Sequence, residues 1–138
     1  MPLFLPFSGL LDGLAAQKVA WLKTLRAGLY QNEVVPFDLM TIAHIEPCDF
    51  SGYIGLRQLL TWGAVSMDGD RARCDHAELI WTHNGGPVSN HVMGFYWINA
   101  AGTLVGINPN ELEENILDVA GKSYRIVPGF TFKTDFPG

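Results

Sequence analysis

Cysteine is scarce in this sequence, whose 138 residues contain only Cys48 and Cys74. Small secreted domains that depend on disulfides carry more cysteines, and the first residues lack the basic segment with which a secretion signal opens. A chain of this length can bury a core that needs neither a disulfide nor a metal to hold it. The sequence therefore predicts two buried free thiols, with a single disulfide between them as the open alternative.

Charge is also low, and it is not concentrated anywhere. Charged residues make up 17% of the sequence against 48% hydrophobic residues, the net charge is −5, and the mean hydropathy is +0.13. The nine Lys and Arg residues are scattered singly, whereas nucleic-acid binding gathers cations on one face. These values exclude a disordered chain and argue against a nucleic-acid partner.

Long hydrophobic runs are absent as well. The apolar opening Met1–Phe7 is far too short to span a bilayer. The next apolar segment, Leu10–Ala20, is interrupted by Asp12, Gln17 and Lys18. We therefore expect no transmembrane helix and no membrane partner.

Motifs of catalysis are missing too. The pair Gly85 and Gly86 precedes neither a helical pattern nor a Lys followed by Ser or Thr, so it predicts a turn and not a phosphate-binding loop. No Gly-x-Ser-x-Gly element occurs, and Ser89 near His91 has no evident acidic partner. The sequence therefore predicts neither an enzyme nor a cofactor.

The residues that most resemble metal ligands lie in the middle of the chain. They are Cys74, Asp75, His76, His83 and His91. A structural zinc site usually presents paired ligands on loops, whereas Cys74 and His76 are two apart on an expected strand. Scattered structural histidines are the better interpretation, and no metal is predicted.

A group of carboxylates farther along the chain offers oxygen ligands for a cation. It consists of Glu111, Glu113 and Glu114. The group lacks the spacing of an EF-hand, so a solvated loop explains it better.

Alternating apolar and polar residues fill most of the chain after its first segment. Residues Ser8 to about Lys18 have helical spacing, with Ser8 as the candidate N-cap. The segments that read as strands are Lys23–Gln31, Leu56–Gly63, Arg71–His83, His91–Ile98, Thr103–Ile107, Ile116–Val119 and Ser123–Lys133. In Arg71–His83 the alternation changes phase near Asp75 and His76, which predicts a bulge or a break there.

Together these segments predict a mainly β fold. About seven or eight strands, spaced by roughly 8–12 residues, are typical of an antiparallel β-sandwich or a jelly-roll-like domain, here with a short N-terminal helix. We expect one domain over residues 1–138, with an arm and helix over 1–22 and the sandwich over 23–138. Residues 32–52 read as a long loop with a helical turn from Asp38 to His44. Tight turns are expected at Met67–Asp70, Asn84–Pro87 and Asn99–Gly102.

One expected strand, His91–Ile98, is apolar on both of its faces. Val92, Tyr96 and Ile98 fall on one face, and Met93, Phe95 and Trp97 on the other. In a small sandwich one face should meet water, so the second face predicts a cover supplied by another copy of the chain or by a different protein. We therefore expect a protein interface at Met93, Phe95, Tyr96 and Trp97.

Aromatic residues permit another interpretation. Trp62, Trp81 and Trp97 are a possible glycan-stacking platform, because aromatic faces bind sugar rings. Aromatic residues of strands usually belong to a core or an interface, so this interpretation ranks second.

A set of turn and aromatic motifs spans nearly the whole chain. They are Leu29-Tyr30-Gln31-Asn32 with Pro36, Asp49-Phe50-Ser51-Gly52-Tyr53 followed by Trp62, Thr82-His83-Asn84-Gly85-Gly86, Gly94-Phe95-Tyr96 with Ala100-Ala101-Gly102-Thr103-Leu104, Ala120-Gly121-Lys122-Ser123-Tyr124, and Pro128-Gly129-Phe130-Thr131. The sequence resembles, in these motifs, a family of small virion proteins of tailed bacteriophages. Relative to that family, Gln17–Leu22 and the loop Phe37–Ile45 are longer here, and the resemblance implies that particle-specific contacts lie in these additions. It carries over no catalytic residue.

The resemblance implies a non-enzymatic structural protein. The expected role is a capsid decoration or cement protein that stabilises the head by binding between capsid subunits. Its partners would be the major capsid protein, other copies of itself in a homo-oligomer, or both, and it would lie on the capsid surface after synthesis in the host cytoplasm. The alternative is a tail or surface adhesion module that binds a host glycan through exposed aromatic residues.

Overall fold

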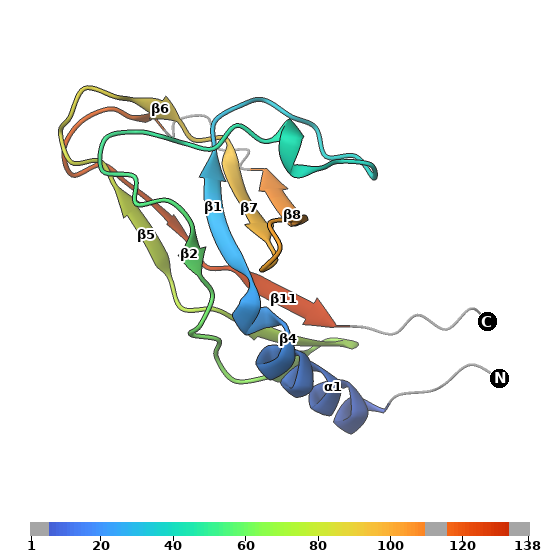
Figure 1. Cartoon of the computed structure of the whole chain (residues 1–138). Helices are drawn as coiled ribbons and strands as arrows, with labels where there is room; N and C mark the ends of the chain where they lie inside the picture. Colours follow the sequence, from blue (N-terminus) through green and yellow to red (C-terminus); the bar gives the residue numbers. More distant parts are fainter. Residues whose placement is uncertain (1–5, 110–115, 133–138) are drawn as a thin grey trace. The chain divides into compact units, whose positions relative to one another are not determined.

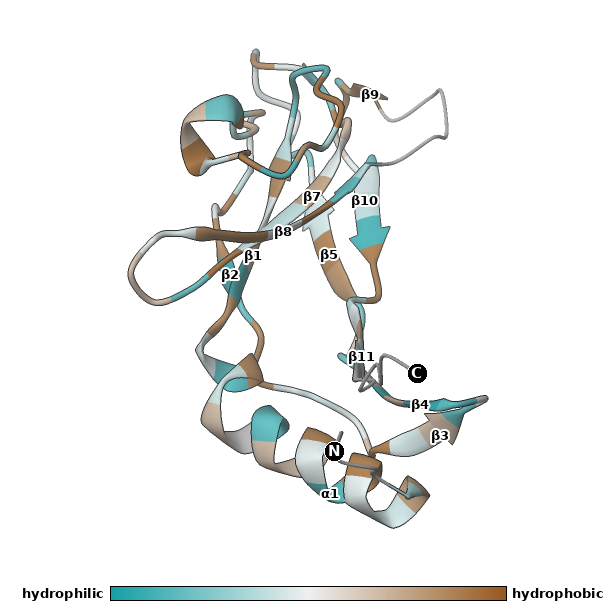
Figure 2. Cartoon of the chain, turned by 90° about the vertical axis from the view of Figure 1, so that its right-hand side faces the viewer, coloured by the Kyte–Doolittle hydropathy of each residue, from teal (hydrophilic) through white to brown (hydrophobic). Residues whose placement is uncertain are grey.

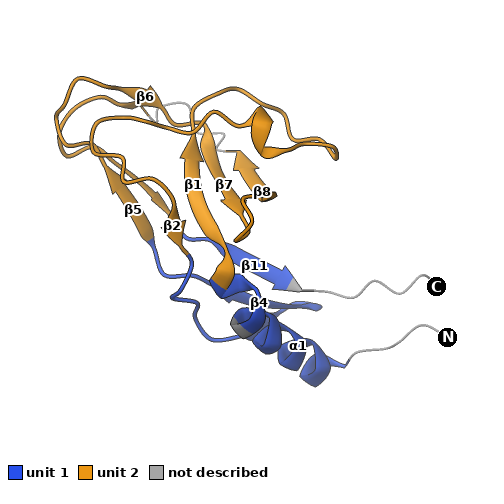
Figure 3. Cartoon of the chain, in the orientation of Figure 1, with its two compact units in different colours: residues 1–23, 59–78, 127–138 blue, residues 24–58, 79–126 orange. Residues whose placement is uncertain are grey.

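The fold is mainly β, with one N-terminal α-helix and antiparallel sheets (Figure 1). The structure is a computed structural model that describes residues 6–109 and 116–132. The chain divides into two compact units, one of residues 1–23, 59–78 and 127–138 and the other of residues 24–58 and 79–126 (Figure 3). A single domain over the whole chain stays a prediction. Among the described residues, no helix has both the length and the apolar content that a membrane span requires.

Unit 1 pairs the helix with a three-stranded sheet. Helix α1 (Phe7–Ala20) packs on a sheet of order β11-β4-β3, formed by β3 (Ser66–Asp68), β4 (Arg71–Asp75) and β11 (Gly129–Phe132). Leu10 and Leu14, one helical turn apart, are both buried. The predicted helix is confirmed, but Ser8 is not its N-cap: Pro6 holds that position, and Ser8 lies inside the first turn.

Unit 2 contains the largest sheet, which has the order β2-β1-β7-β8. Its strands are β1 (Arg26–Tyr30), β2 (Arg57–Gln58), β7 (Gly94–Ile98) and β8 (Leu104–Pro109). Two smaller sheets pair β5 (Leu79–Thr82) with β10 (Ser123–Ile126) and β6 (Asn90–His91) with β9 (Ile116–Leu117). In the large sheet Gly28 lies opposite Tyr96, and a Cβ on Gly28 would come within 2.9 Å of the Tyr96 ring. Glycine is therefore required there because the ring occupies the space of a side chain.

Two of the expected turns and the expected break between strands are present in the structure. The chain turns between β3 and β4 at Gly69, which has a φ of 63° that favours glycine. Strands β7 and β8 form the expected hairpin around Asn99–Gly102. The phase change near Asp75 and His76 is also confirmed as a break, because β4 ends at Asp75 and β5 begins at Leu79.

Three predicted strands are interrupted. In Leu56–Gly63 only β2 is paired, and Trp62 then forms an isolated bridge with His76. In His91–Ile98 the chain breaks before Gly94, where a Cβ would lie 2.8 Å from the Tyr30 Oη. The last strand divides into β10 and β11 around Pro128, whose ring nitrogen has no proton to donate to a ladder.

The count of strands therefore differs from the prediction. The described residues form eleven short strands, in four sheets, where about seven or eight were expected. The short strand expected at Ile116–Val119 is present as β9. The helical turn expected over Asp38–His44 is limited to the 3₁₀ turn η2 (Ile42–His44). A sandwich or jelly-roll arrangement stays a prediction.

Both cysteines are buried free thiols, as predicted. Burial, together with the smaller effect of the nearby carboxylates of Asp49 and Glu46, raises the pKa of Cys48 to about 12. Burial also raises the pKa of Cys74. Because the thiolate is the reactive form, neither side chain is suited to nucleophilic chemistry in the folded protein.

His76 is buried in unit 1 with both ring nitrogens engaged. Its Nε2 accepts a hydrogen bond from the Thr61 N–H at 2.9 Å, and its Nδ1 lies 2.7 Å from the Ala77 carbonyl oxygen, to which it donates. The Trp62 ring packs edge-on against the imidazole with a centroid distance of 5.3 Å. Burial lowers the pKa of His76 below its ordinary value. The neutral imidazole therefore has a structural role, since both of its nitrogens bond to the chain.

We predict that His76 makes stability depend on pH. Its pKa is lower in the folded than in the unfolded chain, so its contribution is complete above the ordinary value of 6.5 and decreases as the pH falls through that value. Thermal melts between pH 7.5 and 5.5 should show a falling Tm, and His76→Gln should flatten this slope. The matched control His91→Gln, at an exposed position, should keep it. A His76→Gln slope equal to that of the wild type would contradict the assignment.

Candidate functional site

The strand expected to form an interface is the inner strand β7. It pairs with β1 on one side and β8 on the other, and Tyr96, Trp97 and Ile98 are at most 9% exposed. The Tyr96 face belongs to a cluster of buried residues: Tyr30, Ile45, Tyr96 and Ile98. Most of the apolar surface of β7 is thus buried within the chain.

The four predicted interface residues do not lie as the alternation suggested. Phe95 and Trp97 share a face, with their rings stacked at a centroid distance of 6.4 Å. Met93 instead packs on the cluster around Tyr30, because the break before Gly94 changes the phase of the chain. Of these four residues, only Met93 and Phe95 are partly exposed, so only these two have side-chain surface that a partner could contact. Contact of Met93, Phe95, Tyr96 and Trp97 with a partner stays a prediction.

The three tryptophans proposed as a glycan platform have almost no exposed surface. Trp81 is 1% exposed, its Nε1–H donates to the Gly55 carbonyl oxygen at 3.1 Å, and the Arg57 guanidinium lies 5.7 Å from its ring centroid. Trp62 and Trp97 are 8% and 9% exposed. A platform of exposed rings built from Trp62, Trp81 and Trp97 is therefore wrong, because all three rings are buried within the chain.

The candidate metal ligands have structural partners. His83 is buried, its Nδ1 accepts the Gly85 N–H at 2.9 Å, and its Nε2–H donates to the Val88 carbonyl oxygen at 2.9 Å. Over residues 6–109 and 116–132, no three His, Cys, Asp or Glu side chains gather in a way that could hold a metal ion. The carboxylates of Glu111, Glu113 and Glu114 lie outside the described residues.

The most distinctive surface lies in the connection from β1 to β2. We call residues 33–45 the apolar loop (Figures 1 and 2). Val35 and Leu39 are each 84% exposed, and Phe37 and Ile42 are also exposed. Val34, Met40 and Ile45 pack in the opposite direction, onto the cluster around Tyr30. The loop is thus anchored by one set of apolar side chains and presents another to solvent.

Several hydrogen bonds lie within the apolar loop and at its base. The Met40 N–H donates to the Phe37 carbonyl oxygen at 3.0 Å, and the Thr41 N–H donates to the His44 Nδ1 at 3.1 Å. The Phe37 ring meets the His44 imidazole edge-on at 4.8 Å. Asn32 closes the base of the loop, since its Nδ2 donates to the His44 carbonyl oxygen and its Oδ1 accepts the Glu46 N–H, both at 2.8 Å. Exposed apolar side chains held this way lose little entropy on binding.

The formal charges of the segment that contains the apolar loop have one sign. No Lys or Arg occurs between Arg26 and Arg57. The same segment carries four carboxylates, those of Glu33, Asp38, Glu46 and Asp49. Charge of one sign around an apolar surface selects partners of the opposite sign.

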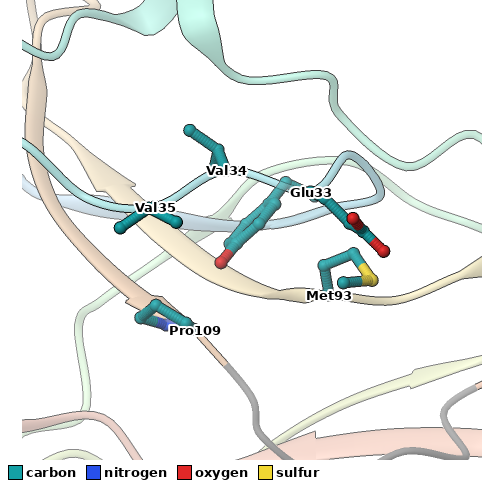
Figure 4. A pocket seen from close by; sticks show the side chains of 6 residues that line it. Glu33, Val34, Val35, Met93 and Pro109 are labelled. Carbon is teal, nitrogen blue, oxygen red and sulfur yellow. The ribbon is translucent and has the colours of Figure 1, made fainter.

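A pocket of about 330 Å³ adjoins the apolar loop in unit 2 (Figure 4). Its lining consists of Tyr30, Glu33, Val34, Val35, Met93 and Pro109. In Figure 4 the carboxylate of Glu33 and the thioether of Met93 lie toward one end, and Val35 and Pro109 toward the other. The pocket therefore combines an apolar wall with one carboxylate.

Reasoning from the residues alone missed this site, although the sequence contains a signal for it. Loops with a proline are usually polar, whereas Val34, Val35, Phe37, Leu39 and Met40 are apolar. Tertiary packing decides which of these side chains face outward, and no periodic pattern in the sequence indicates it. The resemblance did single out Phe37–Ile45, and that segment lies within the apolar loop.

We predict that two apolar residues of this loop differ sharply in their effect on stability. Leu39→Ala should change the free energy of unfolding by less than about 0.5 kcal/mol, because the side chain is already in water. Ile45→Ala should cost about 2–4 kcal/mol, because it opens a cavity in the buried cluster. Urea unfolding of both variants measures this directly. Similar losses for the two would mean that Leu39 is packed and not presented.

Comparison with known proteins gives no relative for this chain. No family model, no curated protein and no solved structure matches it. Its function must therefore be inferred from the geometry of the apolar loop and its pocket, together with the resemblance carried by the sequence motifs.

Proposed function

We propose that this chain is a non-enzymatic structural protein of a bacteriophage virion, namely a decoration or cement protein that stabilises the head by binding between capsid subunits. The observation that carries the binding role is the anchored apolar loop, which presents Val35 and Leu39 almost fully to solvent. The assignment to a virion is supported by the resemblance of the turn and aromatic motifs. We also propose that its sheets form a single sandwich or jelly-roll domain, as the number and spacing of the expected strands suggest.

A binding role explains why the loop retains exposed apolar residues. Apolar side chains exposed to water lower the solubility of a protein. Covering them with a partner contributes a favourable free energy of about 25 cal/mol per Å² of apolar surface buried. Such anchors dominate binding when they enter a pocket of the partner and are surrounded by contacts that exclude water. Val35, Phe37, Leu39 and Ile42 form such an anchor set on one loop.

Cement needs only modest affinity at each site. A protein that binds the assembled shell and not its free subunits stabilises the shell by mass action, by about 2.7 kcal/mol per site at a concentration a hundredfold above Kd. Repetition over the lattice multiplies this effect without any catalysis. The proposed location is thus the outer surface of the capsid, with the major capsid protein as partner.

The test uses virions that lack this chain and are then supplied with purified protein. Wild-type protein should bind in a copy number proportional to the capsid subunits and should raise the temperature at which the particles release DNA. Leu39→Asp should weaken binding by about 2 kcal/mol or more at each site, roughly thirtyfold, because it puts a carboxylate into an apolar contact. Band intensities of bound protein and the heat release of DNA are the two measurements.

A matched control separates the apolar loop from general surface charge. Val119 is also exposed but lies outside the loop, so Val119→Asp should bind and protect as the wild type does. Equal loss in both variants, or particles equally robust without the protein, would overturn the proposal. Density confined to the tail, with a few copies per particle, would instead support a tail adhesion module.

A further inference from the structure

We infer that the pocket beside the apolar loop receives a cationic side chain on an apolar stem, an arginine or lysine of the partner protein. This inference rests on the proposed function only in taking the partner to be a protein. It concerns the pocket lined by Tyr30, Glu33, Val34, Val35, Met93 and Pro109.

The lining of the pocket fits such a side chain. Val34, Val35, Met93 and Pro109 supply apolar walls, and the Glu33 carboxylate supplies the one formal charge (Figure 4). An arginine or lysine buries its methylene stem along apolar surface while its charged end seeks a carboxylate. Since an exposed ion pair alone binds weakly, the contacts of the stem must contribute much of the affinity.

The electrostatic surroundings favour a cation over an anion or a neutral group. Glu33 forms no ion pair with any residue that the structure describes. The segment from Ala27 to Leu56 adds three more carboxylates and no Lys or Arg. A carboxylate ligand would meet repulsion there, whereas a guanidinium or ammonium group would meet attraction.

The chain's own cations are largely engaged, which favours a different protein as their source. Lys18 donates to the Gly63 carbonyl oxygen, Arg57 donates to the Ile80 carbonyl oxygen, and ion pairs join Arg71 to Asp70, Arg73 to Asp68 and Asp75, and Lys122 to Asp118. With a net charge of −5, two copies would also repel each other. The partner is therefore expected to carry a basic residue next to an apolar depression that accepts Val35.

The pocket also touches the anchored part of the loop. Val34 contributes both to the pocket and to the packing around Tyr30, and Val35 contributes both to the pocket and to the exposed apolar surface. One partner surface can thus fill the pocket and cover the loop in a single contact. Electrostatic attraction at Glu33 would fix the orientation of that contact.

The experiment titrates the full-length protein with four small probes and follows the methyl groups of Met93, Val34 and Val35 by NMR. The probes are n-butylguanidinium, n-butylammonium, n-butyrate and n-butanol. The two cations should shift these methyl signals more strongly than butanol, and butyrate least. Glu33→Gln should weaken binding of the cations about two- to fivefold and leave binding of butanol unchanged.

The control is Glu46→Gln, which removes the same charge from the same segment but outside the lining of the pocket. It should leave the affinity for the cations close to that of the wild type. Equal weakening by both variants would show only the general electrostatic attraction of an acidic segment. If butyrate binds as tightly as the two cations, the pocket is not a cation site. Either result overturns the inference.

Two further outcomes separate this inference from the proposed function. If sedimentation shows a dimer that Glu33→Gln dissociates, the cation comes from a second copy, and the assignment to a different partner is wrong. If the probes bind as expected while wild-type protein gives the capsids no protection, the pocket stands and the cement role fails. Conversely, if Leu39→Asp loses the protection of capsids while the wild-type protein binds neither cationic probe, the cement role stands and the inference about the pocket is wrong.

Discussion

The burial of β1 on both faces is the constraint on which unit 2 depends. Ala27, Gly28, Leu29 and Tyr30 are all buried, and the strand has paired neighbours on both sides. The end of β1 also receives the chain as it returns from the apolar loop. The Cys48 N–H donates to the Leu29 carbonyl oxygen, and the Gln31 N–H to the Glu46 carbonyl oxygen, both at 2.9 Å. The loop is therefore closed by an inner strand of the large sheet.

This closure explains how a long connection can be both exposed and ordered. Its base is fixed by the backbone bonds to β1 and by the side chain of Asn32, and its inner face by Met40 and Ile45 against Tyr30. With the backbone bonded in this way, the Leu39 side chain stays almost fully in solvent. Residues such as Leu39 can then vary with the partner while the fold is unaffected. The stability of the sheet and the specificity of the surface are thus encoded by different residues of one segment.

The sequence alone predicted those features that depend on neighbouring residues. The β3–β4 hairpin follows from an Asp-Gly turn, and the break after β4 follows from a change of phase, so both could be seen locally. The interruption before Gly94 could not, because the atoms that crowd this glycine belong to Asn108 and Tyr30, which are distant in the sequence. The same holds for Trp81, whose contacts with the Gly55 carbonyl oxygen and with Arg57 come from a distant part of the sequence. The outward direction of Val35 and Leu39 is likewise decided by which loop residues find space around Tyr30.

The division of the chain into two units affects the order in which the protein can fold. Neither unit is a continuous segment, since the chain passes from one to the other after residues 23, 58, 78 and 126. The central strand of the three-stranded sheet, β4, is made long before its partner β11. During synthesis β4 therefore has one edge without its final neighbour until residues 129–132 have left the ribosome. Contacts between segments so far apart in sequence form slowly, and an open strand edge invites pairing with other chains in the meantime. During synthesis this edge of β4 is therefore a place where another copy of the chain could pair.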